Sequence, residues 1–247
     1  MKYILTLGLL FLLMTSCTNE LIFEEQSFQK KTALPCQKDC PHINVKLPIA
    51  KNVPIVADSI NKKVFSVMKE IIYVGEKPYT STDYEGLLTA FIDSYEQMQR
   101  ENPKDVFGWE GEIEGRVLYQ TDSILNIEIK HYTYTGGAHG YTGRRSLIFD
   151  PATGKSIADE YLFRDIAAFR KFAEQKFRAA YQLTAEEPIN AKGLMFEEDR
   201  FQLPQTYFFT DDGFLLYYNV YEIASYADGP KELLIPYDEM KPYLITK

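Results

Sequence analysis

The stretch from Trp109 to Tyr119 alternates apolar and charged side chains, and this pattern constrains the fold more than any other. The apolar positions are Trp109, Ile113, Val117 and Tyr119, and the charged positions are Glu110, Glu112, Glu114 and Arg116. Successive side chains of a strand point to opposite faces, so we predict an antiparallel strand with one buried face and one solvated acidic face. A solvated strand face is much more common than a pair of catalytic carboxylates.

Further strands are predicted on both sides of this segment. After a turn at 120–123, residues 124–134 and 144–149 complete a meander. Two aromatic-rich runs, 205–210 and 214–220, flank an Asp-Gly pair, which is typical of a hairpin. Other predicted strands are 43–50, where Pro48 favours a sheet edge, and 231–235.

Helices are predicted where apolar residues recur at helical spacing. These segments are 55–74, 83–101 with a Thr82–Glu85 capping box, 165–182, and a short helix ending near 243. Strands cluster in hairpins instead of alternating singly with helices. We therefore predict an α+β fold in which antiparallel sheets pack against amphipathic helices. Two subdomains are expected, at 43–154 and 155–247.

The first 17 residues resemble a bacterial lipoprotein signal. Lys2 is followed by an apolar run from Ile4 to Met14, which is too short to span a bilayer, and then by small residues before Cys17. We expect residues 1–16 to be a signal peptide, Cys17 to be lipidated, and 17–42 to be a tether. The protein would then be exported and lipid-anchored in the cell envelope. An ordinary secretory peptide cleaved nearby is the alternative.

Cys36 and Cys40 remain as a pair in the segment PCQKDCP. Export places them in an oxidising compartment, where a local disulfide is favoured. The alternatives are two free thiols, or a metal pair completed by His42. A zinc site needs about four ligands, and the sequence has no second Cys/His pair, so we expect neither metal nor cofactor.

Charge and composition restrict the partners. The net charge is −8, and it is −9 without the first 16 residues, whose one charged residue is Lys2. An acidic surface argues against nucleic acid and favours cationic partners. Aromatic residues make up 14% of the chain, which is too many for a disordered protein. The sequence does not specify an oligomeric state.

The segment 132–140, YTYTGGAHG, is the most distinctive. Its candidate turn residues are Thr135, Gly136, Gly137, His139 and Gly140. No helix is predicted directly after them, so this is not a phosphate-binding loop. His131 and His139 lack the spacing of known metal motifs, and no GxSxG nucleophile elbow occurs. We therefore predict that the protein is not an enzyme.

A second distinctive segment, 217–230, is rich in tyrosine. Tyrosine presents an apolar ring and a hydroxyl, which suits partner surfaces and sugar stacking. The candidate binding residues are Tyr217, Tyr221, Glu222 and Tyr226. The alternative is an ordinary hairpin whose tyrosines alternate between core and solvent.

Together these motifs resemble a bacterial envelope family. The resemblance rests on YTGGAHG, FDPATGKSIADEYLF at 149–163, the segment 201–230 and LLIPYDEMKPYL at 233–244, and it covers about 43–245. The family includes the extracellular domain of the anti-sigma factor RsiV and the non-catalytic N-terminal region of PdaC-type peptidoglycan deacetylases. Tyr221, Glu222 and Tyr226 fall in its YEI-x-x-Y motif. Val220 and Ser225 stand where many relatives have proline.

The resemblance implies binding and no chemistry. The RsiV domain is a lysozyme receptor, so the expected partner is a lysozyme-like protein or a peptidoglycan-type glycan. We expect neither sigma-factor control nor deacetylation. The two other hypotheses are a cell-wall hydrolase that uses His139 with a nearby carboxylate, and a structural scaffold for another envelope component.

Overall fold

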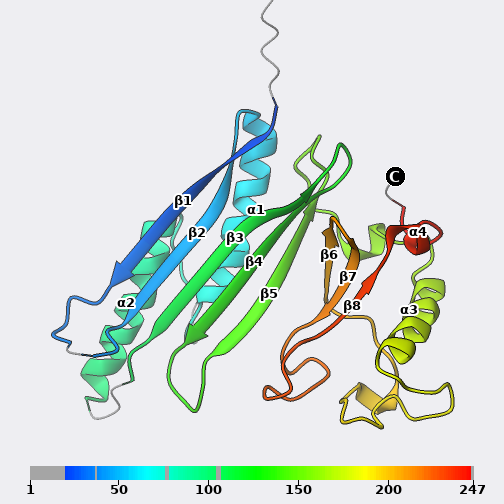
Figure 1. The fold of residues 1–247 in the computed structure, drawn as a ribbon. Coiled ribbons are helices and arrows are strands. Elements are labelled where there is room, and N and C mark those ends of the chain that lie inside the picture. The colour runs from blue at the N-terminus through cyan, green and yellow to red at the C-terminus, as the bar shows by residue number, and fades with distance from the viewer. Residues whose placement is uncertain (1–19, 37, 76–77, 104–106, 246–247) are drawn as a thin grey trace, which may run out of the picture.

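Two β-sheets and four α-helices make up the computed structural model, which describes residues 20–36, 38–75, 78–103 and 107–245 (Figure 1). The larger sheet has the strand order β1-β2-β3-β4-β5. Its strands are β1 (Ile22–Lys31), β2 (His42–Lys51), β3 (Glu110–Gln120), β4 (Leu125–Tyr134) and β5 (Tyr141–Phe149). As predicted, β3, β4 and β5 form an antiparallel meander.

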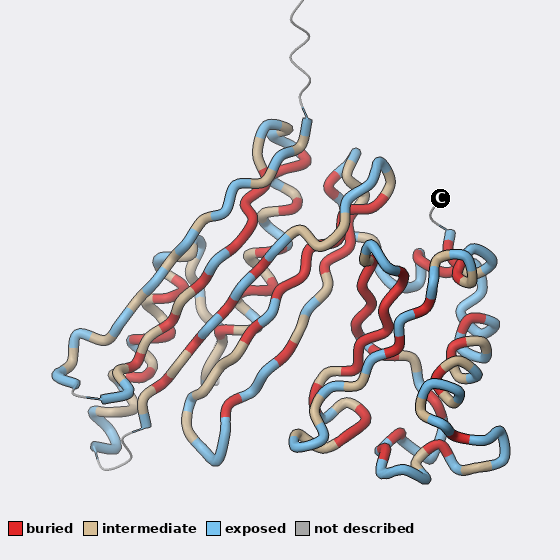
Figure 2. Tube along the Cα trace, viewed as in Figure 1, coloured by how far each residue is buried: buried red, intermediate tan, exposed pale blue. Residues whose placement is uncertain are grey.

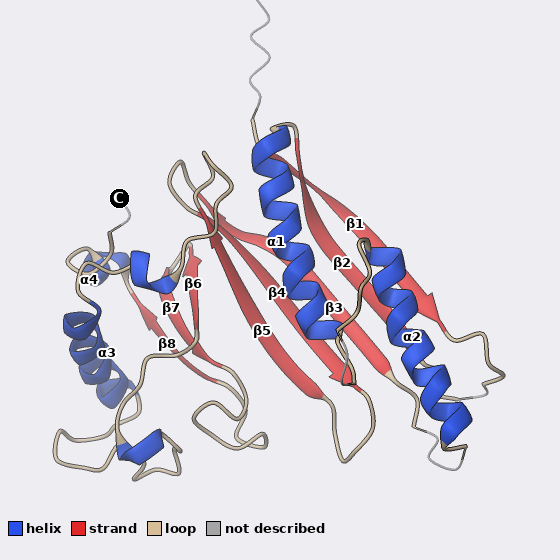
Figure 3. Ribbon diagram, turned by 180° about the vertical axis from the view of Figure 1, so that it is seen from behind, coloured by secondary structure: helices blue, strands red, loops and turns tan. Residues whose placement is uncertain are grey.

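Helices α1 (Pro54–Ile72) and α2 (Tyr84–Glu101) connect β2 to β3 and cover one face of this sheet (Figure 3). The crossover makes β2 and β3 parallel, while the other pairs of the sheet are antiparallel. The opposite face carries the predicted acidic side chains. Glu112 and Glu114 are exposed there, and Glu110 is partly exposed.

The smaller sheet is an antiparallel meander of β6 (Thr206–Thr210), β7 (Gly213–Tyr218) and β8 (Lys231–Ile235). Helices α3 (Ile166–Ala180) and α4 (Tyr237–Met240) accompany it. Two short 3-10 helices lie at Asp159–Tyr161 and Glu197–Asp199. The α+β prediction is therefore confirmed, with one parallel strand pair that the sequence did not indicate.

Each sheet has its own hydrophobic core (Figure 2). The first lies between the large sheet and α1 and α2, and the second is built around α3 and the small sheet. Ile124 and Ile148, from the large-sheet region, belong to the second core. The two predicted subdomains therefore share packed side chains near their boundary.

The predicted tether at 17–42 is wrong for its central part, because residues 22–31 form the edge strand β1. Phe23 and Phe28 pack partly buried against the first core. These two rings are five residues apart, so they break the alternation that identifies a strand in a sequence. Cys17 lies outside the described residues.

The predicted edge position of Pro48 is also wrong, because β2 lies between β1 and β3. The parallel pairing of β2 with β3 runs only from His42 to Lys46. Pro48 lies beyond that ladder, where its missing N–H removes no bond to β3.

The cap of α2 lies one residue later than predicted. The Asp83 carboxylate accepts a hydrogen bond from the Gly86 N–H at 2.7 Å, in place of a Thr82–Glu85 capping box. An aspartate cap combines this bond with a favourable charge at the helix N-terminus. Within the described residues, none of the helices has the length and apolarity needed to cross a bilayer.

Candidate functional site

A cleft of about 940 Å³ lies at the end of the large sheet where β2 and β3 begin and β4 ends. It is bordered by the loop before β2, the loop after β4, and the loop after β7. The side chains that matter below are His42, Glu110, Tyr132, Tyr134, His139 and Tyr226. The cleft therefore draws residues from both regions of the chain.

The loop before β2 forms one wall. Cys36 and Cys40 are joined by a disulfide, as predicted, and both line the cleft. Gly108, two residues before β3, lies against this loop, since an added Cβ would come within 1.8 Å of the Asp39 carbonyl oxygen. The disulfide and this close approach fix the wall in place.

The loop after β4 contains the TGGAHG motif. Gly136 and Gly137 have φ values of +108° and +92°, a region that other residues rarely adopt. Thr135 at its start is exposed. The Tyr134 hydroxyl donates to the Gly137 carbonyl at 3.0 Å. The motif is thus a turn that returns the chain from β4 to β5.

Gly140 has a different role, because it lies directly on the Tyr132 ring. A Cβ at Gly140 would be 2.5 Å from ring atoms of Tyr132. Desolvation, followed by the nearby Glu110 carboxylate, raises the pKa of Tyr132 above its usual value. Its phenol therefore stays neutral and remains a hydrogen-bond donor in the cleft.

The two distinctive sequence segments meet at His139. Its ring stacks on Tyr226 with centroids 4.0 Å apart and planes 19° apart. The His139 Nδ1 lies 2.7 Å from the Gly140 carbonyl oxygen, and Nε2 lies 3.1 Å from the Tyr221 hydroxyl. A carbonyl oxygen can only accept, so Nδ1 donates to Gly140. The predicted residues His139, Tyr221 and Tyr226 are therefore one cluster, and Tyr226 and His139 reach the cleft.

Two of the predicted binding residues, Tyr217 and Glu222, do not line this cleft. Tyr217 is buried, and the Arg144 guanidinium lies 4.3 Å from its ring centroid. The Glu222 carboxylate accepts from the backbone N–H groups of Gln205 and Asn219, both at 2.8 Å. Burial raises the pKa of Glu222, and those hydrogen bonds oppose the shift. Both side chains hold the loop that presents Tyr221 and Tyr226.

His131 is separated from the predicted site by its environment. It is buried on β4, beside Gly143 of β5. Burial and the charge of Arg145 lower the pKa of His131 to about 4. His131 is therefore neutral near pH 7, whereas His139 lies exposed in the loop.

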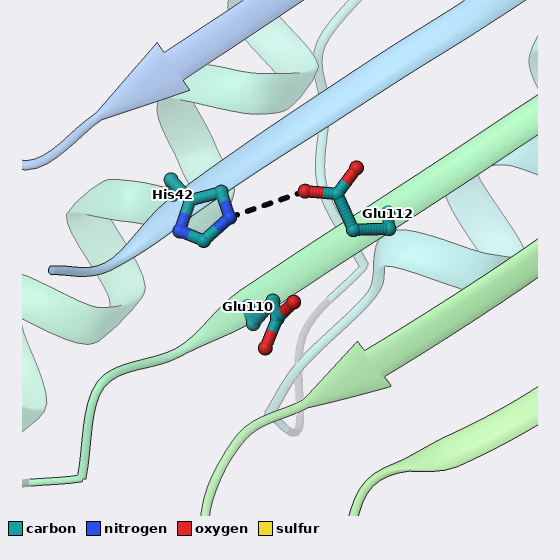
Figure 4. A group of neighbouring side chains, drawn as sticks. All are labelled: His42, Glu110 and Glu112. Carbon is teal, nitrogen blue, oxygen red and sulfur yellow. Dashed lines mark hydrogen bonds and ion pairs between the residues drawn. The ribbon is translucent and has the colours of Figure 1, made fainter. Parts of the chain in front are cut away.

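Three ligand-type side chains gather at the beginning of β2 and β3 (Figure 4). Each of His42, Glu110 and Glu112 offers one atom, and these three atoms lie within 4.8 Å of one another. The His42 Nε2 is 3.1 Å from a Glu112 oxygen. In the sequence, His42 was a candidate ligand only together with the cysteines, because the parallel pairing that brings it to Glu110 and Glu112 leaves no local signal.

Tyr132, Tyr134 and Glu110 were also missed as site residues. The tyrosines belong to the YTYTGGAHG segment, and Glu110 belongs to the acidic strand face. Alternation along a strand gives the face of each side chain. The three loops that border the cleft come from distant parts of the sequence, so the sequence pattern does not show which end of the sheet is accessible.

Comparisons with known proteins agree with this architecture. Residues 35–142 match the family model described as "Deacetylase PdaC", and residues 158–238 match "Protein of unknown function (DUF3298)". No curated protein matches the chain significantly.

Two similar solved structures are DUF3298 family proteins. One, from Pseudomonas aeruginosa, is 23% identical with a TM-score of 0.67, and the alignment covers 91% of this chain and 94% of that one. The other, from Bacteroides fragilis, is 24% identical with a TM-score of 0.66, and the alignment covers 90% and 93%. The first part of the chain is therefore similar to the PdaC family and the second part to DUF3298, and the fold is that of the solved DUF3298 family proteins.

Proposed function

We propose that the protein is a non-catalytic binding protein of the bacterial cell envelope, and that its cleft recognises a peptidoglycan-type glycan. One observation carries the proposal. Aromatic rings from both regions, Tyr132, Tyr134 and Tyr226, line a single cleft together with Glu110 and His42.

This set of side chains suits a sugar. The apolar faces of pyranose rings stack on aromatic rings, while their hydroxyls bond to carboxylates, imidazoles and phenols. Tyr226 already stacks on His139, and this contact holds its ring in a defined orientation. The neutral Tyr132 phenol and the Glu110 carboxylate supply a donor and an acceptor in the same wall.

A lysozyme-like protein is the second candidate partner, and the acidic strand face favours it. Glu110, Glu112 and Glu114 alternate along β3 on the face away from the helices. The chain carries a net charge of −8. A cationic protein would be steered to this face, and its association would slow as salt is added.

The absence of catalysis is part of the proposal. Both ring nitrogens of His139 already face hydrogen-bond partners, the Gly140 carbonyl and the Tyr221 hydroxyl. A general base needs a nitrogen directed at the reacting group. The match to the PdaC family brings no deacetylase activity into this proposal.

We further propose export and anchoring through a lipidated Cys17. The apolar run that precedes Cys17 supports the signal peptide. The Cys36–Cys40 disulfide supports an oxidising compartment. Mass spectrometry of the protein recovered from bacterial membranes would test the anchor. A diacylglyceryl-modified cysteine at the mature N-terminus would support it, and an unmodified cysteine would contradict it.

Calorimetric titration of the full chain with N-acetylglucosamine oligomers and solubilised peptidoglycan fragments tests the function. We expect Tyr226→Ala to weaken glycan binding at least about tenfold, which corresponds to ~1.4 kcal/mol. Tyr161→Ala is the matched control, because Tyr161 is an exposed tyrosine outside the cleft.

Titration with lysozyme at two salt concentrations separates the two candidates. Glycan binding that Tyr226→Ala removes and Tyr161→Ala keeps would support the proposal. Binding of lysozyme alone, weakened by salt and by a Glu110→Gln/Glu112→Gln/Glu114→Gln variant, would favour the second candidate. No binding of either probe would refute both.

A further inference from the structure

We propose that His42, Glu110 and Glu112 form a binding site for a divalent transition metal of the Zn²⁺ type. The site lies at the edge of the cleft, since His42 and Glu110 also line it. Three features of the group support a metal: the placement of the ligands, the orientation of the imidazole, and the two carboxylates beside it.

The strand register places the ligands. His42 is the register partner of Glu110 in the parallel β2–β3 pair, and Glu112 lies two residues further along β3. Residues at spacing two share a face of a strand, so both carboxylates and the imidazole project from the same side of the sheet. Figure 4 shows the three side chains gathered there.

A backbone contact orients the imidazole. The His42 Nδ1 lies 2.9 Å from the Cys40 carbonyl oxygen, so it is the donor in that bond. Metal-binding histidines typically donate their second nitrogen to a carbonyl or carboxylate in this way. Cys40 belongs to the disulfide, which holds the carbonyl in place. The bond leaves Nε2 directed at the carboxylates.

The contact between His42 and Glu112 needs a positive charge between the two groups, which a proton on Nε2 or a bound cation supplies. Nε2 lies 3.1 Å from the Glu112 Oε1, and both atoms are acceptors when the ring is neutral. Asn44 Nδ2 donates to the same oxygen at 2.6 Å and fixes the carboxylate. Lys46, on the same face of β2, is paired with Glu25 instead. A bound cation satisfies the imidazole and both carboxylates together.

The donor set indicates the class of metal. One imidazole nitrogen and two carboxylate oxygens suit zinc and neighbouring transition ions better than Mg²⁺, which prefers oxygen ligands throughout. Tetrahedral zinc, with bonds of about 2.0–2.2 Å, needs ligand atoms roughly 3.4 Å apart. The 3.1 Å separation of Nε2 and the Glu112 oxygen is close to that, and rotation of the partly exposed Glu110 side chain brings the third ligand in.

Three protein ligands leave a coordination position for water or for an oxygen of another molecule. Because Glu110 and His42 line the cleft, a molecule bound there would have access to that position. The metal site does not depend on the proposed glycan function, and either can fail without the other.

The test uses the full, untagged protein, stripped with a chelator under non-reducing conditions. ZnCl₂ is titrated by calorimetry, and CoCl₂ is added separately to record its visible absorption. We expect one zinc per chain and a cobalt spectrum of four-coordinate type. His42→Ala and Glu112→Gln should each weaken zinc binding by at least about tenfold. MgCl₂ should show no comparable binding.

Glu114→Gln is the matched control, since Glu114 is the next exposed carboxylate on the same face of β3 and lies outside the group. Circular dichroism establishes that each variant is folded. Loss of zinc in His42→Ala and Glu112→Gln with retention in Glu114→Gln supports the site. Equal affinity in all four proteins, or an equal loss in Glu114→Gln, would overturn it. Glycan titration of Glu112→Gln without metal distinguishes this failure from failure of the proposed function.

Discussion

The two ends of the acidic face of the large sheet differ in how far their carboxylates are buried. At one end, Glu128 is fully buried and bonded to Arg116 at 2.7 Å and to Arg144 at 2.5 Å. At the other, Glu112 has 45% of its side chain exposed and faces His42. Both carboxylates lie on the same face of neighbouring strands.

The difference comes from what covers each end. The small sheet packs near Glu128, and the Arg144 guanidinium lies over the rings of Phe208 and Tyr217, with centroids 4.4 and 4.3 Å away. At the other end, the cleft beside Glu110 is bordered by the loops before β2, after β4 and after β7. The same alternating strand pattern thus gives a buried ion-pair network at the end covered by the small sheet, which we call the closed end. At the other end, which we call the open end, it gives an accessible cleft. The closed end joins the two regions, and the open end provides the site.

The largest expected loss of stability comes from removing the buried carboxylate of the closed end. Glu128→Ala leaves Arg144 partly buried without its main counterion, and such losses cost about 3–5 kcal/mol. Urea unfolding should show this decrease in the free energy of unfolding. Glu114→Gln, on the exposed part of the face, should change it by no more than about 0.5 kcal/mol. Similar losses in both variants would contradict the contrast between the two ends.

The next effect concerns pH and the buried His131, which lies between the two ends on the opposite face of β4. Burial and Arg145 lower its pKa to about 4, against about 6.5 when unfolded. Between these values the unfolded chain binds more protons, so the stability from this group falls as pH drops from about 6.5 to 4. The total is on the order of 3 kcal/mol.

His131→Phe tests this, because phenylalanine has no titrating group. Urea unfolding of both proteins at several pH values should show a smaller loss of stability in the variant between pH 6.5 and 4. A loss of the same size in both would mean that other groups cause the acid sensitivity.

A smaller loss of stability is expected for Gly140→Ala, at the open end. An alanine Cβ would lie 2.5 Å from the Tyr132 ring, so the ring must move. Overpacking of this kind costs about 1–3 kcal/mol. Tyr132 should also leave its place in the cleft, and glycan affinity should fall.

Gly137→Ala separates packing from backbone strain. Gly137 has a φ of +92°, but no atom lies within 4 Å of an added Cβ. Its substitution should therefore destabilise the loop without displacing Tyr132. If both variants lower glycan affinity equally, the contact between Gly140 and Tyr132 is not what shapes the cleft.

The sequence predicted local structure well and the relation between distant segments poorly. The strand at Trp109–Tyr119 and the two long helices at 55–74 and 83–101 follow from periodicity, the hairpin at 205–220 follows from its Asp-Gly turn, and all were found. The strand at Ile22–Lys31 was missed because an exposed edge strand needs no regular apolar alternation. Its stability comes from pairing with β2, which is a tertiary contact.

The site shows the same limit. The motif residues His139, Tyr221 and Tyr226 were selected from two segments, and the structure brings them into contact. Tyr217 belonged to the same tyrosine-rich segment but is buried, because its ring packs against the Arg144 guanidinium of β5. His42 and Glu112 are 70 residues apart, and only the parallel pairing of β2 with β3 joins them.

The smallest expected effect comes from removing one hydroxyl near the open end. Tyr221→Phe removes the hydroxyl that lies 3.1 Å from the His139 Nε2 and keeps the ring that packs near Tyr226. The bond is exposed, so its loss should cost only about 0.5 kcal/mol of stability, the lower end of what a hydrogen bond contributes. Its effect on glycan binding should exceed its effect on stability, because the freed imidazole no longer holds Tyr226 in one orientation. Calorimetry beside urea unfolding measures both. If unfolding changes while binding does not, the His139 cluster supports the loop only, and the cleft is shaped by Tyr132 and Tyr134.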